Sequence, residues 1–339
     1  MRAIVHTEFG NPAEVLHVED RPIPEPGPGQ VRVKVTLAPI HNHDLSTVRG
    51  TYGFRPQLPA PAGTEIVGLI DALGANVAHL RPGQRVVSGT HFGVWADYAV
   101  VDAAGVIPVP DQLDDATAAQ LVAMPFSAVT LLDFLNVEPG QWIVVNSANG
   151  TIGRLLSQLA AARGVNVVGL VRRDAATQGL DRVVSTQQED WREQVAAITG
   201  GADIVAGVES VGGPAANQVL KLLAPGATLV TFGAMSEKHM ELSAGTIIFK
   251  DITVRGFWGK RVAEQMPQDK KMALIGEVIQ RVAEGSVTLP VDQTFAADDV
   301  QEAVRASLAP GRSGKVLLRF SCGDGEGGGT TVTPAYPRR

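Results

Sequence analysis

Trp142-Ile-Val-Val-Asn-Ser-Ala-Asn-Gly-Thr-Ile-Gly153 leads directly into Arg154-Leu-Leu-Ser-Gln-Leu-Ala-Ala-Ala162. The apolar run predicts a strand, the small residues after it a tight turn, and the leucine- and alanine-rich segment a helix. This order is typical of a dinucleotide-binding βα turn, in which the N–H groups at the helix start face the pyrophosphate. We expect Gly150 to let the backbone approach that anion and Gly153 to let the helix pack closely, while Ala148 replaces the first glycine of the motif.

A second apolar run, Asn166-Val-Val-Gly-Leu-Val171, follows at the distance expected for the next parallel strand of a βαβ unit. It ends in Arg172 and Arg173, where an NAD-specific site carries Asp or Glu for the ribose 2′-hydroxyl. Arginines at this place favour the 2′-phosphate of NADPH. The alternative is that both arginines form a solvated strand end.

Length and composition indicate a globular α/β protein of the cytoplasm. The 339 residues exceed the usual size of one domain, so two domains are expected. The net charge of −6, with both signs interspersed, argues against a nucleic-acid partner. The single cysteine, Cys322, fits a reducing compartment and excludes an intrachain disulfide. The N-terminal residues are strand-like, and no apolar stretch reaches membrane-spanning length, so neither secretion nor a membrane partner is expected.

Short β-branched runs separated by Pro and Gly fill the first third of the chain. They predict a small barrel of strands at 2–6, 30–36, 63–72, 84–87 and 95–101. Helical periodicity begins near Asp114. Either Asp111 or Asp114 is expected to cap a helix over 116–123, and a second helix is expected over 128–135.

Strands and helices alternate in the remainder of the chain, which predicts a parallel sheet covered on both faces. The strands expected after the first βαβ unit lie at 202–208, 227–232 and 252–257, and the helices at 215–223 and 269–283. The chain then returns to strand, helix and strand at 294–295, 300–308 and 315–320. We therefore expect a nucleotide domain, 119–287, inserted into a barrel domain formed by 1–118 and 288–320.

Two segments fit no regular element. Only the eight residues 174–181 separate Arg173 from the strand-like Arg182-Val-Val-Ser185, which is too few for a crossover helix. This stretch is either a trimmed element or a deletion. The tail 321–339 is rich in glycine and poor in apolar residues, so it is expected to be flexible.

Motifs outside the nucleotide turn resemble the medium-chain dehydrogenase/reductase superfamily, in its zinc-free branch of quinone reductases and mitochondrial-type 2-enoyl thioester reductases. They lie within residues 1–320 and are Ala38-Pro-Ile-His-Asn-His-Asp-Leu45, Arg49-Gly-Thr-Tyr-Gly53, Pro59-Ala-Pro-Ala-Gly-Thr-Glu-Ile-Val-Gly68, Leu80-Arg-Pro-Gly-Gln-Arg-Val86, Gly93-Val-Trp-Ala-Asp-Tyr-Ala99 and Val137-Glu-Pro-Gly140. Ile248-Phe-Lys-Asp-Ile-Thr-Val-Arg-Gly-Phe-Trp258 is closer to the thioester reductases. The resemblance implies a Rossmann-type doubly wound sheet inserted into a GroES-like β-barrel catalytic domain.

The resemblance also implies that no metal takes part. Zinc alcohol dehydrogenases of this superfamily hold their catalytic metal with Cys at the place of His41, His at the place of Thr64, and a third ligand near Met124. Only His41 could bind zinc here, and a catalytic zinc needs three protein ligands. His41 and His43, which stand just ahead of Asp44, are expected to be helix-start and packing residues.

Tyr52 is the candidate proton donor, since its segment resembles the one that carries the catalytic tyrosine of the enoyl reductases. A phenol keeps its proton at neutral pH and can polarise a thioester enolate or protonate it. Hydride would reach the β-carbon of the substrate and the proton its α-carbon. The alternative is a loop tyrosine that packs on the cofactor or closes the cleft.

The resemblance assigns the remaining cofactor positions. Asn149, Gly150, Thr151 and Ile152 would face the pyrophosphate, and Arg172 and Arg173 the 2′-phosphate. The residues expected to border the nicotinamide or to reach the cofactor are Phe232, Gly233, Ala234, Met235, Phe257, Trp258 and Lys315. One departure concerns Met124, because the reductases usually carry an Asn there whose amide contacts the cofactor.

Three functions remain open on these grounds. The first is an NADPH-dependent, zinc-independent reductase of an activated C=C bond, with a trans-2-enoyl thioester as substrate. The second is an NADPH:quinone oxidoreductase, and the third is a non-catalytic, crystallin-like NADPH-binding protein. An isologous homodimer is also expected, because the strand at 252–257 lies at a sheet edge in this superfamily.

Overall fold

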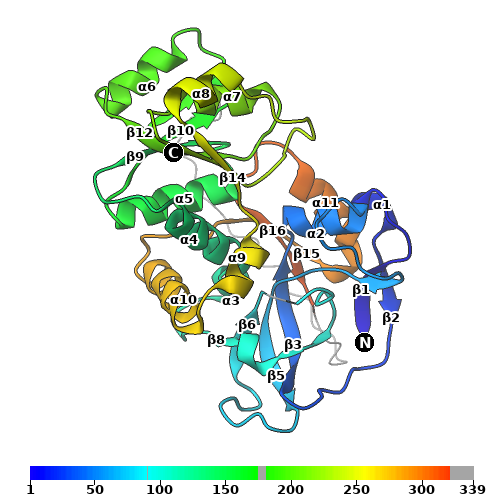
Figure 1. Cartoon of the computed structure of the whole chain (residues 1–339). Coiled ribbons are helices and arrows are strands. Elements are labelled where there is room, and N and C mark those ends of the chain that lie inside the picture. The colour runs from blue at the N-terminus through cyan, green and yellow to red at the C-terminus, as the bar shows by residue number, and fades with distance from the viewer. Residues whose placement is uncertain (90, 175–180, 321–339) are drawn as a thin grey trace, which may run out of the picture.

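The computed structural model describes residues 1–89, 91–174 and 181–320 and arranges its strands in two large sheets and one small one (Figure 1). The tail 321–339 and most of the segment 174–181 lie outside the described residues, so the expectations for both stay predictions.

The first large sheet has six strands, and all of its strand pairs are parallel. Its strands, in spatial order, are β11 (Val183–Ser185), β10 (Asn166–Val171), β9 (Trp142–Asn146), β12 (Ile204–Glu209), β13 (Thr228–Thr231) and β14 (Thr253–Gly256). The order along the chain reverses at β9. The space between β9 and β12 at their carboxyl ends is therefore the topological switch point, where such sheets bind ligands.

Helices cover both faces of this sheet, because alternate side chains of its strands are apolar on both sides. Ile143 and Val145 of β9 belong to the same core cluster as α4 (Ala123–Leu135), α5 (Thr151–Ala162) and α10 (Gln268–Ala283). Val144 lies in a second cluster on the opposite face. The helices that contribute to this second cluster are α6 (Trp191–Thr199), α7 (Pro214–Leu222) and α8 (Ala244–Lys250).

The second large sheet has seven strands and is mostly antiparallel. Its path runs β15 (Val291–Ala296), β16 (Lys315–Arg319), β3 (Gln30–Pro39), β5 (Ile66–Leu73), β6 (Arg85–Ser88) and β8 (Ile107–Pro108), and β7 (Tyr98–Asp102) pairs with β3. A small sheet contains β2 (His17–Asp20), β1 (Arg2–His6) and β4 (Ala60–Pro61).

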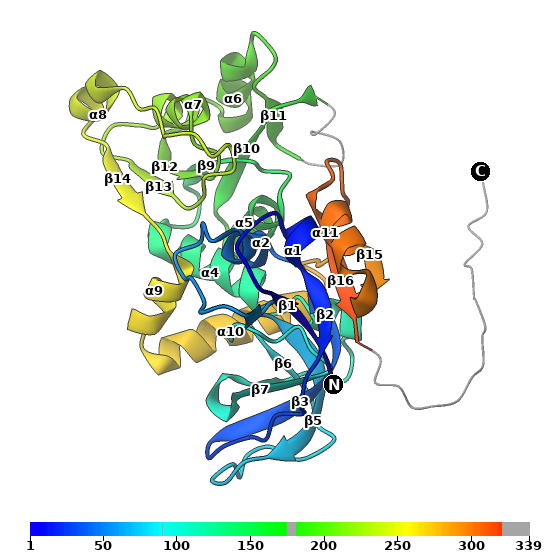
Figure 2. The same cartoon turned by 90° about the vertical axis from the view of Figure 1, so that its right-hand side faces the viewer.

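The end of the chain completes the sheet that its beginning forms. β16 pairs with β3. The helix α11 (Val300–Leu308) packs against α1 (Pro12–Val15), and these two helices lie side by side in Figure 2. The expected fold class is confirmed: a Rossmann-type parallel sheet is inserted into a GroES-like barrel. The domain boundaries at 118/119 and 287/288 stay predictions. Among the described residues, the remaining helices are α2 (Asn42–Arg49), α3 (Asp115–Ala118), α9 (Gly259–Gln265) and the 3-10 turns Ala103–Gly105 and Ala297–Asp299.

The helix expected over 116–123 is wrong. Asp114 is the cap, since its carboxylate accepts from Thr117 N at 2.7 Å, but α3 ends after one turn. The next helix, α4, starts at Ala123 rather than at 128. The reason is a buried acceptor, because Glu65 Oε1 takes the N–H groups of Val122 and Ala123 at 2.6 and 3.0 Å. Because these two N–H groups are bonded to Glu65, they cannot extend α3, and α4 begins at this point.

No helix was predicted from the sequence at α6, α8 or α9. The described residues contain no helix that is both long and apolar enough to cross a membrane.

Candidate active site

The turn between β9 and α5 lies at the switch point of the parallel sheet. Ser147, rather than Ala148, adopts the left-handed conformation of this turn, with φ of 53°. A Cβ atom on Gly153 would lie 2.7 Å from backbone atoms of Ser147 and Ala148, so only glycine allows α5 to begin this close to the turn. Gly150 is the N-cap of α5 and offers no side-chain acceptor. The first N–H groups of this helix are therefore directed at whatever anion approaches the crevice.

Most of the predicted cofactor residues follow the carboxyl ends of parallel strands. Ala148, Asn149, Gly150, Thr151, Ile152 and Gly153 follow β9, Arg172 and Arg173 follow β10, Phe232, Gly233, Ala234 and Met235 follow β13, and Phe257 and Trp258 follow β14. Both arginines are exposed and come directly after β10. Parallel strands place these residues along one edge of the sheet, where a dinucleotide can contact them together.

Phe257 and Lys315 differ from the other predicted residues in their surroundings. Phe257 is only 5% exposed, and its ring packs against Phe134 at 5.3 Å and Phe232 at 6.3 Å between centroids. The structure therefore places Phe257 in the core behind the crevice. Lys315 is buried at the start of β16, with Nζ 3.4 Å from Ile40 O, and burial lowers its pKa to about 8.

A polar pair that the sequence analysis missed joins the strand ends beside the crevice. Asn146 Nδ2 donates to Glu209 Oε1 at 3.0 Å, and Asn146 Oδ1 accepts from Ser210 N at 2.8 Å. Glu209 Oε1 also accepts from Val211 N and Gly212 N, each at 2.7 Å. These bonds fix β9 to β12 at the switch point. The apolar runs of β9 and β12 end in Asn146 and Glu209, and these polar ends were the sequence signal for the pair.

Tyr52 lies where the barrel meets the parallel sheet. It follows α2, whose C-cap Gly50 has φ of 76°, and its N–H donates to Ser46 O at 3.2 Å. The indole Nε1 of Trp258 donates to the Tyr52 hydroxyl at 3.3 Å. The Trp258 ring covers Gly53, where an added Cβ would be 3.2 Å from the ring. Tyr52 and Trp258, which the sequence assigned to separate roles, therefore form one contact across the two sheets.

A second contact across the two sheets involves Asn42, whose Nδ2 lies 3.7 Å from Met235 Sδ. Lys260 adds a third, because its Nζ lies 5.5 Å from the ring centroid of Phe54 and 5.7 Å from that of Phe92. Residues predicted to border the nicotinamide thus face the segment that carries Tyr52.

His41 and His43, at the start of α2, are helix-start and packing residues, as the sequence predicted. His41 is the N-cap of α2 and is fully buried, with Nε2 2.7 Å from Glu65 Oε2. Burial raises the pKa of Glu65 to about 7 and lowers that of His41 well below its ordinary value. Through Glu65, the start of α2 in the barrel is joined to the start of α4. The sequence analysis assigned no role to Glu65, although a charged residue next to an apolar strand was a visible signal.

In this protein, the residues at the zinc-ligand positions of the superfamily form hydrogen bonds with other side chains. His41 is engaged with Glu65, while Thr64 Oγ1 donates to Asp44 Oδ1 at 2.7 Å and lies 2.6 Å from His43 Nε2. Across the described ranges, no three His, Cys, Asp or Glu side chains are grouped to hold a metal ion. The expectation that no metal takes part stays a prediction.

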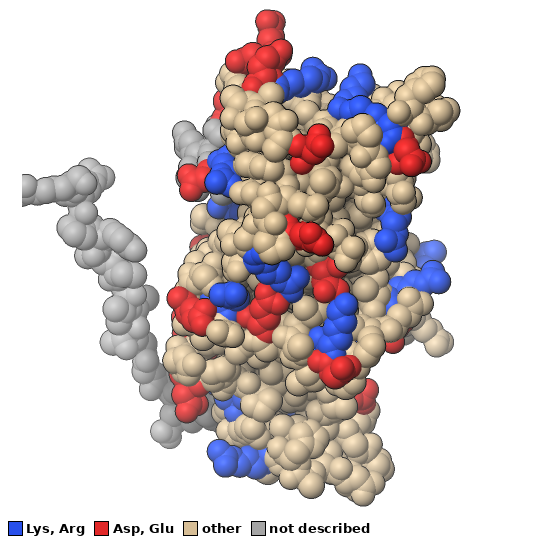
Figure 3. Space-filling view, turned by 60° about the vertical axis from the view of Figure 1, so that its left-hand side comes forward, with Lys and Arg blue, Asp and Glu red and all other residues tan. Residues whose placement is uncertain are grey.

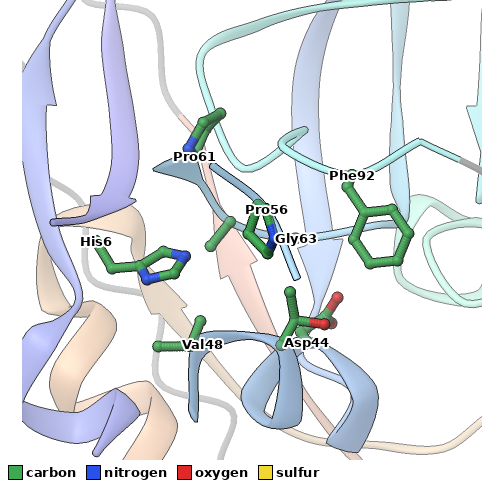
Figure 4. A pocket seen from close by; sticks show the side chains of 9 residues that line it. His6, Asp44, Val48, Pro56, Pro61, Gly63 and Phe92 are labelled. Atoms are coloured by element: carbon green, nitrogen blue, oxygen red, sulfur yellow. The ribbon is translucent and has the colours of Figure 1, made fainter. Parts of the chain in front are cut away.

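A small cavity lies behind α2, between His6 and Phe92, with Asp44 at its edge (Figure 4). Its volume of about 10 Å³ has room for one water molecule at most. This cavity is therefore too small for a substrate.

The fold and the site together define a class of protein. A Rossmann-type sheet with an uncapped helix start at its switch point faces a barrel-borne tyrosine, which is the arrangement of nicotinamide-dependent dehydrogenases and reductases.

Comparison with known proteins specifies the class further. Residues 27–111 match the alcohol dehydrogenase GroES-like domain, and residues 151–274 match the zinc-binding dehydrogenase domain. Mitochondrial enoyl-acyl-carrier-protein reductase of Homo sapiens is 31% identical over 329 residues, which cover 94% of this chain and 88% of the relative. A Bacillus thuringiensis protein assigned as an NADPH:quinone reductase has a TM-score of 0.87 at 29% identity, over 94% of this chain and 98% of that one.

A mycobacterial protein solved with NADPH has a TM-score of 0.82 at 25% identity and covers 94% of this chain and 100% of its own. The chain belongs to the medium-chain dehydrogenase/reductase family, and it is an oxidoreductase.

Proposed function

We propose that this protein is an NADPH-dependent, zinc-independent reductase that transfers hydride to the activated C=C bond of a trans-2-enoyl thioester. The contact between Tyr52 and Trp258 carries the proposal, because it places a phenol beside residues expected to border the nicotinamide. The similarity to enoyl-acyl-carrier-protein reductases supports the same substrate class.

The crevice fits NADPH in two respects. The start of α5 offers N–H groups without a side-chain cap, and a Cβ on Gly150 would crowd Ser147 O at 3.1 Å, so the backbone is open to a pyrophosphate at this turn. Arg172 and Arg173 are exposed at the end of β10, where the 2′-phosphate of the adenosine ribose would lie. When bound, NADPH supplies the hydride that reduces the β-carbon.

The chain itself supplies the proton. Since the indole N–H of Trp258 donates to the Tyr52 oxygen, the phenol hydrogen stays available to an acceptor on the substrate. As the thioester carbonyl gains enolate character, the Tyr52 O–H can stabilise it and then pass its proton to the α-carbon. Trp258, at 42% exposed, and Met235, at 61% exposed, would form the apolar wall on the other side of the substrate.

The experiment that tests this proposal is NADPH oxidation by the purified protein with a medium-chain trans-2-enoyl-CoA and, in parallel, with a 1,4-quinone. Turnover of the thioester alone supports the proposal. Turnover of the quinone alone would replace it with the second candidate, an NADPH:quinone oxidoreductase, which the similarity to the Bacillus thuringiensis protein favours. Tyr52 would then be a wall of the cofactor cleft.

A homodimer formed through β14, a cytoplasmic location and the absence of a nucleic-acid partner are part of the same proposal. β14 is an edge strand, and Phe249 in the helix before it is 88% exposed. On the face shown in Figure 3, positive and negative side chains are interspersed, which is unlike the basic stripe of a nucleic-acid site.

A further inference from the structure

His43 lies beside the proposed proton donor and has no part in the reaction as described so far. It is the second residue of α2, its side chain is 20% exposed, and its ring centroid is 5.9 Å from that of Tyr52. Its ring also stacks on that of His41, with the two ring centroids 5.1 Å apart. His43 is thus the titratable group between the buried His41–Glu65 pair and the tyrosine.

The hydrogen bonds of Thr64 determine which nitrogen of His43 carries hydrogen. A hydroxyl has one hydrogen, and that of Thr64 is donated to the Asp44 carboxylate at 2.7 Å. Thr64 Oγ1 must therefore accept at its contact of 2.6 Å with His43 Nε2. Nε2 carries the hydrogen, and Nδ1 is the nitrogen that can take up and release the second proton.

Charged and titratable groups lie close to His43. Asp44 is only 2% exposed, and its Oδ1 lies 3.6 Å from His43 Nε2. The other titratable groups of this buried cluster are His41, which stacks on the imidazole, Glu65, which is bound to His41, and Lys315 at the start of β16.

We propose that His43 is the proton relay that restores Tyr52 after each turnover. This inference rests on the proposed function. When the α-carbon of the substrate gains its C–H bond, the Tyr52 O–H bond breaks and leaves a phenolate. The Nδ1–H bond of the His43 imidazolium then breaks, and its proton forms the new O–H bond of Tyr52, directly or through one water. Neutral His43 keeps its Nε2 hydrogen on Thr64, and Nδ1 takes its next proton from solvent.

His43→Gln tests the relay, because its amide can still donate to Thr64 but carries no exchangeable charge. In the NADPH-loaded protein with a trans-2-enoyl-CoA, we expect kcat to fall about 100-fold, the lower end for a positioned proton-transfer group, with KM unchanged. Imidazole added to the assay should restore part of kcat. We expect the kcat of the wild type to decline at high pH and that of His43→Gln to lack this decline. Added imidazole should restore the decline in the variant. His17→Gln, the same change at a partly exposed histidine of β2, should have no effect.

Wild-type kcat and pH profile in His43→Gln would overturn the relay if Tyr52→Phe is inactive in the same assay. Activity retained by Tyr52→Phe would instead exclude Tyr52 as the proton donor, and the relay with it.

A second measurement does not depend on turnover. Long-range ¹H–¹⁵N correlation spectra of the full chain should show neutral His43 protonated at Nε2, and Thr64→Val should abolish this preference. Protonation at Nδ1 in the wild-type protein would overturn the inference.

Discussion

The indole N–H of Trp258 and the hydroxyl of Tyr52 are hydrogen-bonded at 3.3 Å, although 206 residues separate them in the chain. Trp258 follows β14, the edge strand of the parallel sheet, and Tyr52 follows α2 of the barrel. The bond thus places a proton donor of one domain against the wall of the other.

Tyr52→Phe should lower kcat for a trans-2-enoyl-CoA by at least about 100-fold, because it removes the proton donor and leaves the ring in place. The dissociation constant of NADPH, measured by fluorescence titration, should change little. Tyr98→Phe removes a phenol from β7 and should leave kcat unchanged. Equal activity of Tyr52→Phe and wild type would exclude Tyr52 from the mechanism.

Trp258→Phe should keep an aromatic ring against Gly53 while removing the N–H that orients the Tyr52 hydroxyl. The loss of one hydrogen bond of about 1 kcal/mol corresponds to a drop in kcat of roughly fivefold. Because the two side chains act through one bond, the double variant Tyr52→Phe, Trp258→Phe should be no slower than Tyr52→Phe alone. Independent, additive effects would contradict this coupling.

Arg172→Ala together with Arg173→Ala should weaken NADPH binding and leave NADH binding nearly unchanged. Two charge-assisted hydrogen bonds of about 1.5–3 kcal/mol each would raise the NADPH dissociation constant by roughly 100-fold or more. Arg192→Ala, which removes an arginine of α6 stacked on Trp191, is the matched control. If both cofactors lose affinity equally, the arginines are a solvated strand end rather than a 2′-phosphate site.

Glu65→Gln should change how stability depends on pH. The folded pKa of Glu65, about 7, exceeds its ordinary value of 4.5, so the folded state binds more protons between these values than the unfolded state. Wild-type stability relative to Glu65→Gln should therefore fall as pH rises from 4.5 to 7, by about 3 kcal/mol. Urea unfolding at several pH values measures this difference.

The variant Glu65→Gln keeps an oxygen for the N–H groups of Val122 and Ala123 and an amide donor for His41, so it should fold. The exposed Glu302→Gln serves as control and should produce no such trend. A difference between wild type and Glu65→Gln that does not vary with pH would show that Glu65 is ionised throughout this range.

Phe249→Asp should convert the expected homodimer into a monomer, as measured by light scattering. Phe249 and Ile248 are 88% and 69% exposed on α8, next to the edge strand β14. A charge placed there would be desolvated by a partner strand at high cost. Met272→Asp introduces the same charge at a position of α10 that is 52% exposed, and it should leave the mass unchanged. A monomeric wild-type protein would refute the dimer itself.

The sequence alone determined the parts of the protein whose cause is local. Apolar runs, alanine-rich segments and the glycines at 150 and 153 act within a few residues, so β9, α5 and β10 were predicted close to their observed bounds. Residues 288–320 were likewise expected to complete the barrel domain, because their short strand, helix and strand would suit that role. Helix starts were less predictable wherever a distant side chain supplied the cap, as Glu65 does for α4.

Only the tertiary structure decided which polar groups meet. Tyr52 meets Trp258, Asn146 meets Glu209, and His43 is bound through Thr64 to Asp44. Sequence periodicity shows which face of an element is buried, but not which residue of another element lies opposite. Hydrogen bonds require their partners within about 3 Å, and that closeness is set by how the two sheets pack together. The candidate residues of the site were thus visible in the sequence, while their connections arose from the fold.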